Sequence, residues 1–405
     1  MNKIEKLIEQ YCPDGVEFLK LGEVLNFSNG KGHEKAISEN GNFIVVNSKF
    51  ISTNGDVKKY SNNQISPLFI DDILLVMSDL PNGRALARTF FVDANELYTL
   101  NQRICSLSVK DRTKLLPKFY YYFLNRNSQF LRFDNGVDQT NLRKDDILNL
   151  SIPTPPLPIQ EEIVNILDKF TELKAELKAE LKARFQQYDF YRNQLLAFEN
   201  QEVEWKTLGE VGTFTRGKRF VRTDMIEEGF PCIHYGEMYT HYNIFANESK
   251  SFVSPELAKK LRVANYGDVV IVAAGETIED IGRGTAWLGE SDVVTHDACF
   301  TFKSPLNPKY VSYFLRTKLF HNQIKKHISS GKISAINAKG LAQARIPVPS
   351  IQEQERIVKI LDQFDALLND ISVGLPAEIQ ARKQQYEHYR SKLLTFKPLT
   401  IYNSL

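Results

Sequence analysis

The sequence contains no long hydrophobic run. A helix that crosses a bilayer needs about 18 or more consecutive apolar residues, and no such stretch occurs in the 405 residues. The opening segment, MNKIEKLIEQ, lacks the apolar core of a signal peptide. We therefore expect no membrane contact and no export, and we predict a cytoplasmic location.

The sequence also has few cysteines and a small net charge. Cys12, Cys105, Cys232 and Cys299 lie far apart and form no C-x-x-C pair, which argues against a zinc knuckle, a redox pair or a disulfide framework. We expect reduced thiols, mostly buried. The formal net charge is only +2, so any case for nucleic-acid binding depends on local arrangement. The length, with 42% hydrophobic residues, predicts two or more domains with their own cores.

The motifs of several enzyme classes are missing. There is no D/N-P-P-Y/F/W adenine-methylase motif and no G-x-x-x-x-G-K-S/T phosphate loop, since the string SSGKIS from Ser329 to Ser334 lacks the required residues. His234, His241 and His296 form no i, i+4 pair with a nearby carboxylate. We expect this chain to have no catalytic residue, no cofactor and no metal.

Three blocks of sequence occur twice, in the same order. VEFLKLGEVLNFSNGK at 16–31 matches VEWKTLGEVGTFTRGK at 203–218 without a gap. IPTPPLPIQEEIVNILDKF at 152–170 matches IPVPSIQEQERIVKILDQF at 346–364, also without a gap. RFQQYDFYRNQLLAF at 184–198 matches RKQQYEHYRSKLLTF at 382–396. A repeat of this kind determines architecture more firmly than local propensity does.

Between these blocks the two halves diverge, so two similar frames surround two dissimilar inserts. We predict a first domain with a helical lead-in at 1–151, a helical spacer at 152–200, a second domain at 201–345 and a second helical spacer at 346–405. The cyclic order of domain and spacer predicts an approximate two-fold axis.

The spacers have the pattern of long helices. After a proline-rich entry, apolar residues recur at steps of three and four from Gln160 to Phe198, which is typical of a coiled-coil seam about 58 Å long. An ordinary amphipathic core helix is the alternative, but a stripe this long needs a partner, and the second spacer supplies one. We therefore expect an antiparallel pair, broken in the second spacer near Gly374 and Pro376. The predicted fold class is mixed α/β: two α/β domains separated by two long helices that form an antiparallel coiled coil.

Together, the proline-led spacers, the LGEV starts and the R-x-Q-Q-Y-x-x-Y-R-x-x-L-L helices resemble the specificity subunits of Type I restriction–modification enzymes. The resemblance covers essentially the whole chain. It implies two target recognition domains, each reading one half of a split double-stranded DNA site. It also implies that the spacers bind two modification subunits, which methylate adenine N6 with S-adenosylmethionine. Restriction subunits that translocate DNA with ATP and Mg²⁺ complete the enzyme that the family implies.

The candidate DNA contacts lie in the divergent inserts, because sequence is read by side chains that reach base edges. For any single residue, a solvated surface group or an internal ion pair is about as likely an explanation. In the first domain the candidates are Lys31, His33, Asn82, Gly83, Arg84, Asn101, Gln102, Arg103, Gln139 and Asn141. In the second domain they are Arg216, Lys218, Arg219, Arg222, Tyr235, Arg283 and His296. Gly30 and Gly217 are candidates for close backbone approach. At seam spacing, Tyr188, Tyr191, Tyr386 and Tyr389 favour packing in the core or at a subunit interface over base stacking.

The first spacer contains ELKA three times in tandem, from Glu172 to Ala183. Each unit adds about 6 Å of helix, so the number of units is a candidate for setting the gap between two half-sites. A generic solubilising helix is an equally good explanation. Two other functions remain open for the chain: the specificity subunit of a Type IIB-like system, and an orphan coiled-coil scaffold without a working methylase.

Overall fold

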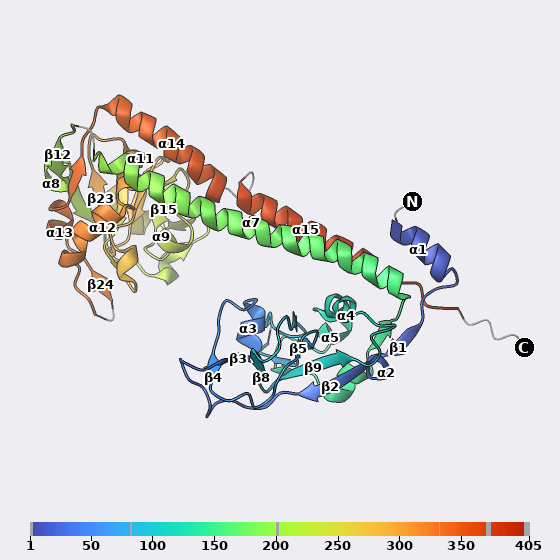
Figure 1. Ribbon diagram of the computed structural model, residues 1–405. Coiled ribbons are helices and arrows are strands. Elements are labelled where there is room, and N and C mark those ends of the chain that lie inside the picture. The colour runs from blue at the N-terminus through green and yellow to red at the C-terminus, as the bar shows by residue number, and fades with distance from the viewer. Residues whose placement is uncertain (1–2, 82, 200–201, 332, 370–373, 401–405) are drawn as a thin grey trace, which may run out of the picture. The chain divides into compact units, whose positions relative to one another are not determined.

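The computed structural model describes residues 3–81, 83–199, 202–331, 333–369 and 374–400. The chain forms two compact units: unit 1 contains residues 1–176 and 380–405, and unit 2 contains residues 177–379 (Figure 1). The predicted first domain falls in unit 1 and the predicted second domain in unit 2. The four segment boundaries given above remain a prediction, because the compact units divide the first spacer between them.

Unit 1 is built on two small sheets. One sheet has the strand order β2-β9-β5-β7, and the other has the order β4-β3-β8. Their bounds are β2 Leu25–Asn29, β9 Ile104–Val109, β5 Ile73–Val76, β7 Thr89–Phe91, β4 Tyr60–Ser61, β3 Phe43–Val46 and β8 Tyr98–Leu100. All four residues of β5 are buried, which is why its sequence ILLV is a continuous apolar run rather than an alternating one. Helix α4 (Pro117–Leu124) packs on β5 and β7.

Unit 2 repeats this topology with extra strands. Its sheets have the orders β13-β23-β19-β21-β16 and β14-β17-β15-β22-β18. The bounds are β13 Thr213–Arg216, β23 Cys299–Lys303, β19 Val269–Val272, β21 Gly284–Trp287, β16 Phe245–Ala246, β14 Met225–Ile226, β17 Ser251–Val253, β15 Phe230–Ile233, β22 Val293–Thr295 and β18 Arg262–Ala264. The β3–β8 and β15–β22 pairs are both parallel, and the strands around β5 and β19 are antiparallel. Two dissimilar sequences therefore adopt one topology.

Shorter elements surround these sheets in both units. In unit 1 they are α1 Lys3–Tyr11, β1 Phe18–Lys20, α2 Leu21–Val24, α3 Ser48–Ser52, β6 Ser78–Asp79, α5 Ser128–Leu131, β10 Thr140–Asn141, α6 Lys144–Leu148 and β11 Ser151–Pro153. In unit 2 they are β12 Trp205–Thr207, α8 Leu208–Val211, α9 Glu237–Thr240, α10 Pro255–Ala258, β20 Ala274–Gly275, α11 Pro308–Phe314, α12 Lys318–Ile324, β24 Ser334–Ala335, α13 Ala338–Ala342 and β25 Arg345–Pro347. Single 3-10 turns occur at Arg222–Asp224, Ile278–Asp280 and Lys325–His327.

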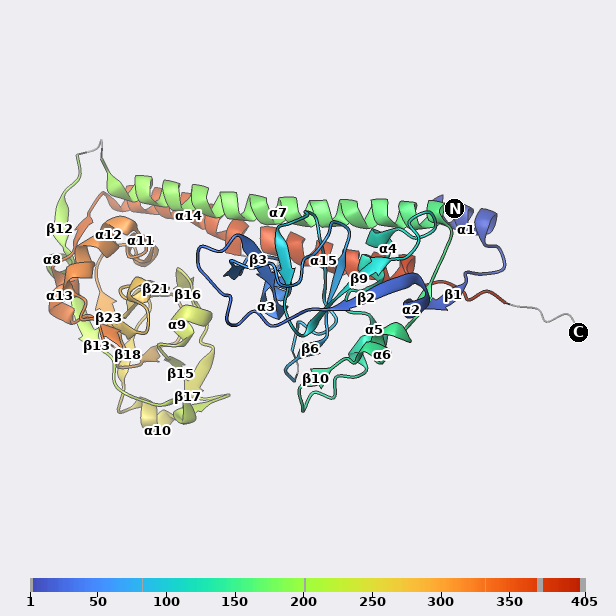
Figure 2. The ribbon, with the colours of Figure 1, turned by 60° about the horizontal axis from the view of Figure 1, so that its bottom comes forward.

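Three long helices carry the repeated spacers. Helix α7 (Leu157–Ala197) is continuous over 41 residues, about 60 Å, which confirms the predicted helix. The second spacer consists of α14 (Ile351–Asn369) and α15 (Leu375–Leu393), with Pro376 in the first turn of α15, so the predicted break is confirmed. Within unit 1, α15 runs antiparallel to the first part of α7, and within unit 2, α14 runs antiparallel to the second part (Figures 1 and 2).

Equivalent aromatic contacts hold the helices together in each unit. The Phe170 ring stacks on Tyr389 with ring centroids 5.6 Å apart, and the Phe364 ring stacks on Tyr191 at the same separation. Both phenylalanines end an I-L-D-x-F block, so the repeated sequence builds the same seam twice. The predicted α/β class with long antiparallel helices is confirmed.

The same three side chains fasten each α/β domain to its helix. In unit 1, Asp168 of α7 accepts hydrogen bonds from Lys118 Nζ at 2.7 Å and Tyr122 Oη at 2.5 Å. In unit 2, Asp362 of α14 accepts from Lys309 Nζ, and from Tyr313 Oη at 2.7 Å. We call each set of three the domain clamp.

A buried glutamine adds to each domain clamp. Gln160 Oε1 accepts from the Leu116 N–H at 2.8 Å, and Gln354 Oε1 accepts from the Asn307 N–H at 2.9 Å. These side chains are 0% and 3% exposed, so their amides replace backbone partners that the loops lack.

All four cysteines are free and buried, as expected. Throughout the described ranges, no helix is both long enough and apolar enough to cross a membrane.

Candidate nucleic-acid interface

One end of the sheets in unit 1 gathers most of the predicted contacts. Backbone hydrogen bonds run from Lys31 N–H to the Leu100 carbonyl at 3.1 Å, and from Met77 N–H to the Arg103 carbonyl at 2.9 Å. The Leu142 N–H in turn donates to the Met77 carbonyl at 2.7 Å. The end of β2, the β8–β9 turn and the β6–β10 pair thus form one edge, which we call turn edge 1 (residues 29–34, 77–81, 83–84, 101–103 and 139–141).

Turn edge 1 presents mixed polar side chains. Lys31, Arg84, Gln102, Arg103, Gln139 and Asn141 are all exposed there. Some are already held in place: Gln139 Nε2 donates to Ser78 Oγ at 2.8 Å, and Gln102 Nε2 donates to Glu34 Oε1 at 2.6 Å. Cationic and amide side chains on one edge are the types that read guanine and adenine. Gly83 lies against the Asp79 carboxylate, whereas Asn82 lies outside the described residues.

His33 does not belong to the exposed set, and the prediction of a DNA contact for it needs correction. Its side chain is 1% exposed, and Nε2 lies 2.8 Å from Thr99 Oγ1. Its Nδ1 lies 2.7 Å from the Lys31 carbonyl. Because both ring nitrogens have partners inside the unit, His33 stabilises the loop that carries Lys31.

Unit 2 has the equivalent edge. The Lys218 N–H donates to the Thr295 carbonyl at 3.1 Å, and the Ala273 N–H donates to the Ala298 carbonyl at 2.7 Å. These are the counterparts of the bonds made by Lys31 and Met77. We call this edge turn edge 2 (residues 216–222, 234–235, 273–275, 296–298, 329–331 and 333–335). Its exposed side chains include Arg216, Lys218, Arg219, Arg222 and Tyr235. Arg216 Nε donates to the Asp297 carbonyl at 2.9 Å.

Gly30 and Gly217 occupy the same place on the two edges. A Cβ at Gly30 would lie 2.0 Å from the Asn101 carbonyl oxygen, and one at Gly217 would lie 2.2 Å from the His296 carbonyl oxygen. The predicted close backbone approach is therefore present, but each glycine approaches the protein's own turn.

Beneath turn edge 2 lies a cluster of aromatic rings. The His234 and His296 ring centroids are 4.6 Å apart, and Tyr235 lies 4.6 Å from His234. Phe220 packs on both histidines. Burial is the main cause that lowers the pKa of His234 and of His296, which favours neutral rings.

The predicted DNA contact of His296 also needs correction. Its side chain is 8% exposed, and its Nδ1 accepts a hydrogen bond from the Ala298 N–H at 3.0 Å. It therefore supports the turn that underlies Lys218, while the neighbouring Tyr235, which is 36% exposed, has a free surface.

Arg283 is not placed among the exposed groups of turn edge 2. Its guanidinium pairs with Asp280 at 2.9 Å, and it lines a cavity together with residues of α7, of α12 and of the α11–α12 junction. The other basic candidates of unit 2 lie together, so the structure separates Arg283 from the cluster in which the sequence placed it.

A hairpin of turn edge 2 was missed at the sequence level. Strand β24 pairs with β20 as β10 pairs with β6, and Ser329 N–H donates to the Ala335 carbonyl at 2.9 Å. Ile333 on this hairpin is 63% exposed, at the position that Gln139 occupies in unit 1. Its place in the sequence could have indicated a contact with DNA. The hairpin lies between α12 and α13, as Gln139 and Asn141 lie between α5 and α6.

The four seam tyrosines divide into two groups. Tyr188 is 5% exposed and belongs to the core of unit 2, and Tyr386 packs against the core of unit 1. Tyr191 and Tyr389 are 38% and 40% exposed although each stacks on a phenylalanine. A subunit contact by Tyr188 is excluded by its burial, whereas contacts by Tyr191 and Tyr389 stay a prediction.

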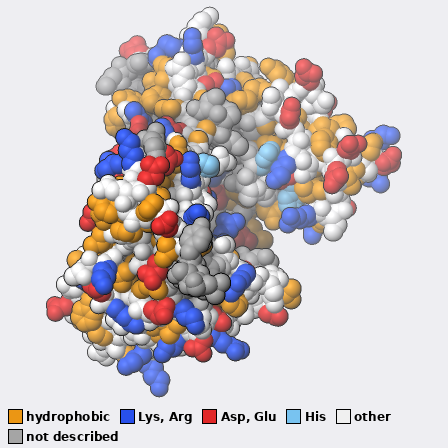
Figure 3. Space-filling model, turned by 90° about the vertical axis from the view of Figure 1, so that its right-hand side faces the viewer, with side chains coloured by type: hydrophobic (Ala, Val, Ile, Leu, Met, Phe, Trp, Pro, Cys, Tyr) orange, Lys and Arg blue, Asp and Glu red, His pale blue; other side chains and the backbone are white. Residues whose placement is uncertain are grey.

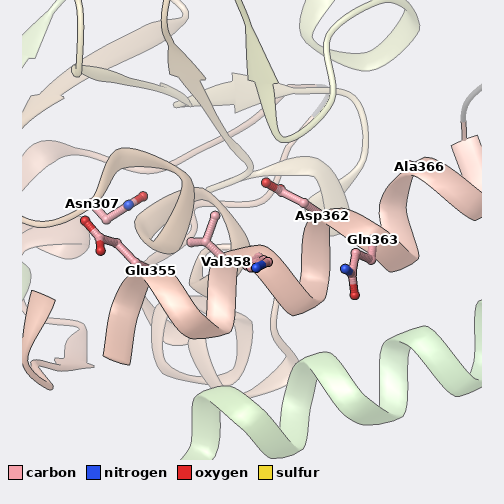
Figure 4. Close-up of a pocket in the computed structure, with 7 residues that line it drawn as sticks. Asn307, Glu355, Val358, Asp362, Gln363 and Ala366 are labelled. Atoms are coloured by element: carbon pink, nitrogen blue, oxygen red, sulfur yellow. The ribbon is translucent and has the colours of Figure 1, made fainter. Parts of the chain in front are cut away.

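A further cavity lies along α14 in unit 2. Figure 4 shows Glu355, Val358, Asp362 and Gln363 on its wall, with Asn307 facing Glu355. The lining contains no histidine, cysteine or serine, and Asp362 is already used in the domain clamp.

On the face in Figure 3, lysine and arginine side chains are interspersed with acidic and apolar ones, as the small net charge predicts. Among the described residues, no group of three or more His, Cys, Asp or Glu side chains is placed to hold a metal ion.

Two topologically equivalent α/β domains, each fastened to long helices and each with a different polar edge, define a duplicated recognition protein. The chain belongs to the Type I restriction modification DNA specificity domain family, whose model matches residues 13–185 and 200–381. Its function is accordingly DNA-sequence specificity within a Type I restriction–modification system.

Individual relatives agree with this assignment. The Type I restriction enzyme EcoR124I/EcoR124II specificity subunit of Escherichia coli is 34% identical over 77% of this chain and 80% of its own length. A putative type I restriction enzyme specificity subunit of Haemophilus influenzae is 33% identical over 71% of this chain and 74% of its own length. A solved structure, whose description concerns complex assembly and conformational transition of the type I R-M system, is similar with a TM-score of 0.64 at 18% identity. It covers 94% of this chain and 97% of its own chain, and supports the fold.

Proposed function

We propose that the chain reads an asymmetric, interrupted double-stranded DNA site, with one half-site bound by turn edge 1 and the other by turn edge 2. The proposal rests on one observation: the two units have the same topology, but the equivalent edges present different side chains. Amide groups are prominent at turn edge 1, whereas turn edge 2 is dominated by arginine. Different donors and acceptors select different bases, so the two half-sites differ.

The partners follow from the family. Two modification subunits bind the helical spacers and methylate adenine N6 with S-adenosylmethionine, and restriction subunits supply ATP-dependent translocation and cleavage. The chain itself contributes recognition without catalysis, in the cytoplasm. Exposed aromatic groups on the helices support a docking role, since Phe190 is 58% exposed and Tyr191 and Tyr389 are each more than a third exposed.

The test is to express the chain with its cognate modification subunit and to sequence the methylated sites of the host. Gln139→Ala is expected to relax the bases of one half-site only, and Arg219→Ala those of the other half-site only. Each lost base contact costs about 1–3 kcal/mol.

Binding measurements provide the second readout. The affinity of the assembled complex for its site is expected to fall steeply as the salt concentration rises. Binding releases counterions from the DNA, and this release is less favourable when the solution already contains many ions. A single substitution that altered both half-sites, or methylation independent of both edges, would contradict the proposed division. An orphan scaffold or a Type IIB-like partner would be recognised by absent methylation or by the identity of the bound subunit.

A further inference from the structure

Unit 2 contains a cavity in which cations outnumber carboxylates. Its wall includes Arg192 of α7 and Arg283, which directly precedes β21. Arg316 and Lys318, at the α11–α12 junction, and His321 of α12 complete the basic part of the wall. Asp189 and Glu279 are the acidic members of the lining. Asp189 pairs with Arg192 at 2.8 Å, and Asp280, outside the lining, pairs with Arg283. Arg316 and Lys318 remain without a carboxylate among the described ion pairs of this wall.

The guanidinium of Arg316 is poorly compensated. Its Nη2 donates to the carbonyls of Asn243 at 2.7 Å and Gly284 at 3.3 Å, which carry only partial negative charge. Its Nε, like that of Arg192, is buried with no acceptor among the described residues. A buried donor without an acceptor costs free energy, so both positions favour an added acceptor.

Electrostatics agree with this geometry. Burial is the largest cause that lowers the pKa of Arg316 to about 10, and the neighbouring charges of Arg283 and Arg192 act in the same direction. Tyr188 and Asp365 act in the opposite direction, without cancelling the effect. Like charges held close together are stabilised when an anion enters.

The grouping recurs in unit 1 despite the divergence of the two inserts. Arg390 takes the place of Arg192 in the repeated helix block, and Arg88 takes that of Arg283, because Val76 and Val272 donate to their carbonyls in the same way. Arg126 lies close enough to Arg88 to lower its pKa, although burial is the larger cause. Arg88 and Arg390 thus stand at places equivalent to Arg283 and Arg192, whereas Arg126 aligns with Thr317, one residue after Arg316. Two recurring arginines, with a third close by, indicate a shared requirement.

We propose that the cavity of unit 2 binds a phosphate group, with Arg192, Arg283 and Arg316 as its walls and Lys318 at its rim. A tetrahedral dianion offers several acceptor oxygens, and guanidinium groups match phosphate geometry well. Two sources supply this chemistry: free inorganic phosphate, and a backbone phosphate of bound DNA. The first does not depend on the proposed function, whereas the second rests on it.

The first experiment uses the full chain and inorganic phosphate. Thermal unfolding and titration calorimetry are measured in phosphate and in sodium chloride of equal ionic strength. Phosphate is expected to raise the Tm in a saturable way beyond chloride, since a ligand that binds only the folded state stabilises it. Lys318→Gln is expected to weaken phosphate binding about fivefold, the effect of losing one nearby charge in water.

The matched control is Lys303→Gln, which removes another exposed lysine, at the end of β23 and outside the lining of the cavity. Its phosphate affinity should equal that of the unmodified chain. Phosphate acting no differently from chloride, or Lys318→Gln and Lys303→Gln behaving alike toward phosphate, would overturn the proposed site.

The second experiment identifies the source. Excess phosphate at constant ionic strength is added to the complex of the assembled enzyme with a DNA duplex. If a DNA phosphate occupies the cavity, phosphate competes with the duplex and Lys318→Gln lowers DNA affinity relative to Lys303→Gln. If the two variants bind DNA equally while only Lys318→Gln loses phosphate, the occupant is a free anion. Failure of the assembled enzyme to bind DNA would refute the proposed function and leave the phosphate result standing.

Discussion

Arg103 combines exposure with an unfavourable backbone. Its φ is 70°, in the left-handed region that costs an L-residue about 1–2 kcal/mol, yet the position in the β8–β9 turn is not glycine. Strain of this kind persists where the surrounding structure enforces it, and it is often found at functional sites. The arginine at this position therefore suggests that its side chain is needed at turn edge 1.

Replacing Arg103 by alanine or by glycine separates these two effects. Both changes remove the guanidinium, so both are expected to weaken DNA binding by about 1–3 kcal/mol. Only glycine adopts a positive φ freely, so Arg103→Gly should be about 1 kcal/mol more stable than Arg103→Ala. Filter binding and urea denaturation give the two quantities. Arg112→Ala, at the other end of β9, is the control; the idea fails if it weakens DNA binding as much.

The sequence did not predict which individual polar residues are exposed. Lys31 and His33 are two positions apart and both polar, yet one is exposed and the other is enclosed by Thr99. Arg283 and Arg219 are both arginines, but Arg283 forms an ion pair with Asp280 in a cavity, whereas Arg219 is exposed at turn edge 2. Burial of a polar side chain depends on partners that are distant in sequence, so residue type alone predicted the clusters better than their members.

At the level of elements, the domain clamps repeat across the two units although the flanking inserts differ. Each tyrosine hydroxyl donates to a carboxylate of a spacer helix, and burial is the main cause that raises the pKa of Tyr122 and of Tyr313. Each phenol therefore stays a donor through the neutral range. The clamps tie the orientation of each domain to its helix.

Tyr122→Phe and Tyr313→Phe are expected to lower the free energy of unfolding by about 1.5–3 kcal/mol each, because each deletes a hydrogen bond to a charged acceptor without changing the packing volume. The urea midpoint measures the loss. Tyr121→Phe is the matched control, since its hydroxyl takes part in none of the described hydrogen bonds. Equal midpoints for all three variants would show that the clamps contribute nothing to stability.

Long elements were predictable and short ones were not. The apolar residues of α7 recur at steps of three and four over many turns, and the proline ring of Pro376 is itself a steric reason for a break. By contrast, β10 and β24 have two residues each and exist only because β6 and β20 lie beside them. No local pattern encodes a strand of that length.

For the whole molecule, the duplicated design was the most predictable feature, since the blocks recur in the sequence itself. The ELKA repeat extends this reasoning: all three units lie in α7, and Leu177 is 8% exposed. Deleting Glu176 to Ala179 shortens α7 by about 6 Å. The gap between half-sites is expected to change by one or two base pairs, roughly 3.4 Å each.

Sequencing of methylated sites measures that gap. A variant of equal length, with Glu176 and Lys178 both replaced by alanine, should keep the original spacing. An unaltered gap after the deletion would reject the repeat as a determinant of spacing.

The division of the chain has a consequence for its synthesis. Unit 2 is one uninterrupted stretch, whereas unit 1 needs residues from both ends, with the Val16 N–H bonded to the Lys397 carbonyl at 2.8 Å. On a ribosome the N-terminal domain usually folds first. Here residues of unit 1 that are made before unit 2 gain their partners from residues that are made after it, so unit 2 acquires its complete set of contacts before unit 1 does.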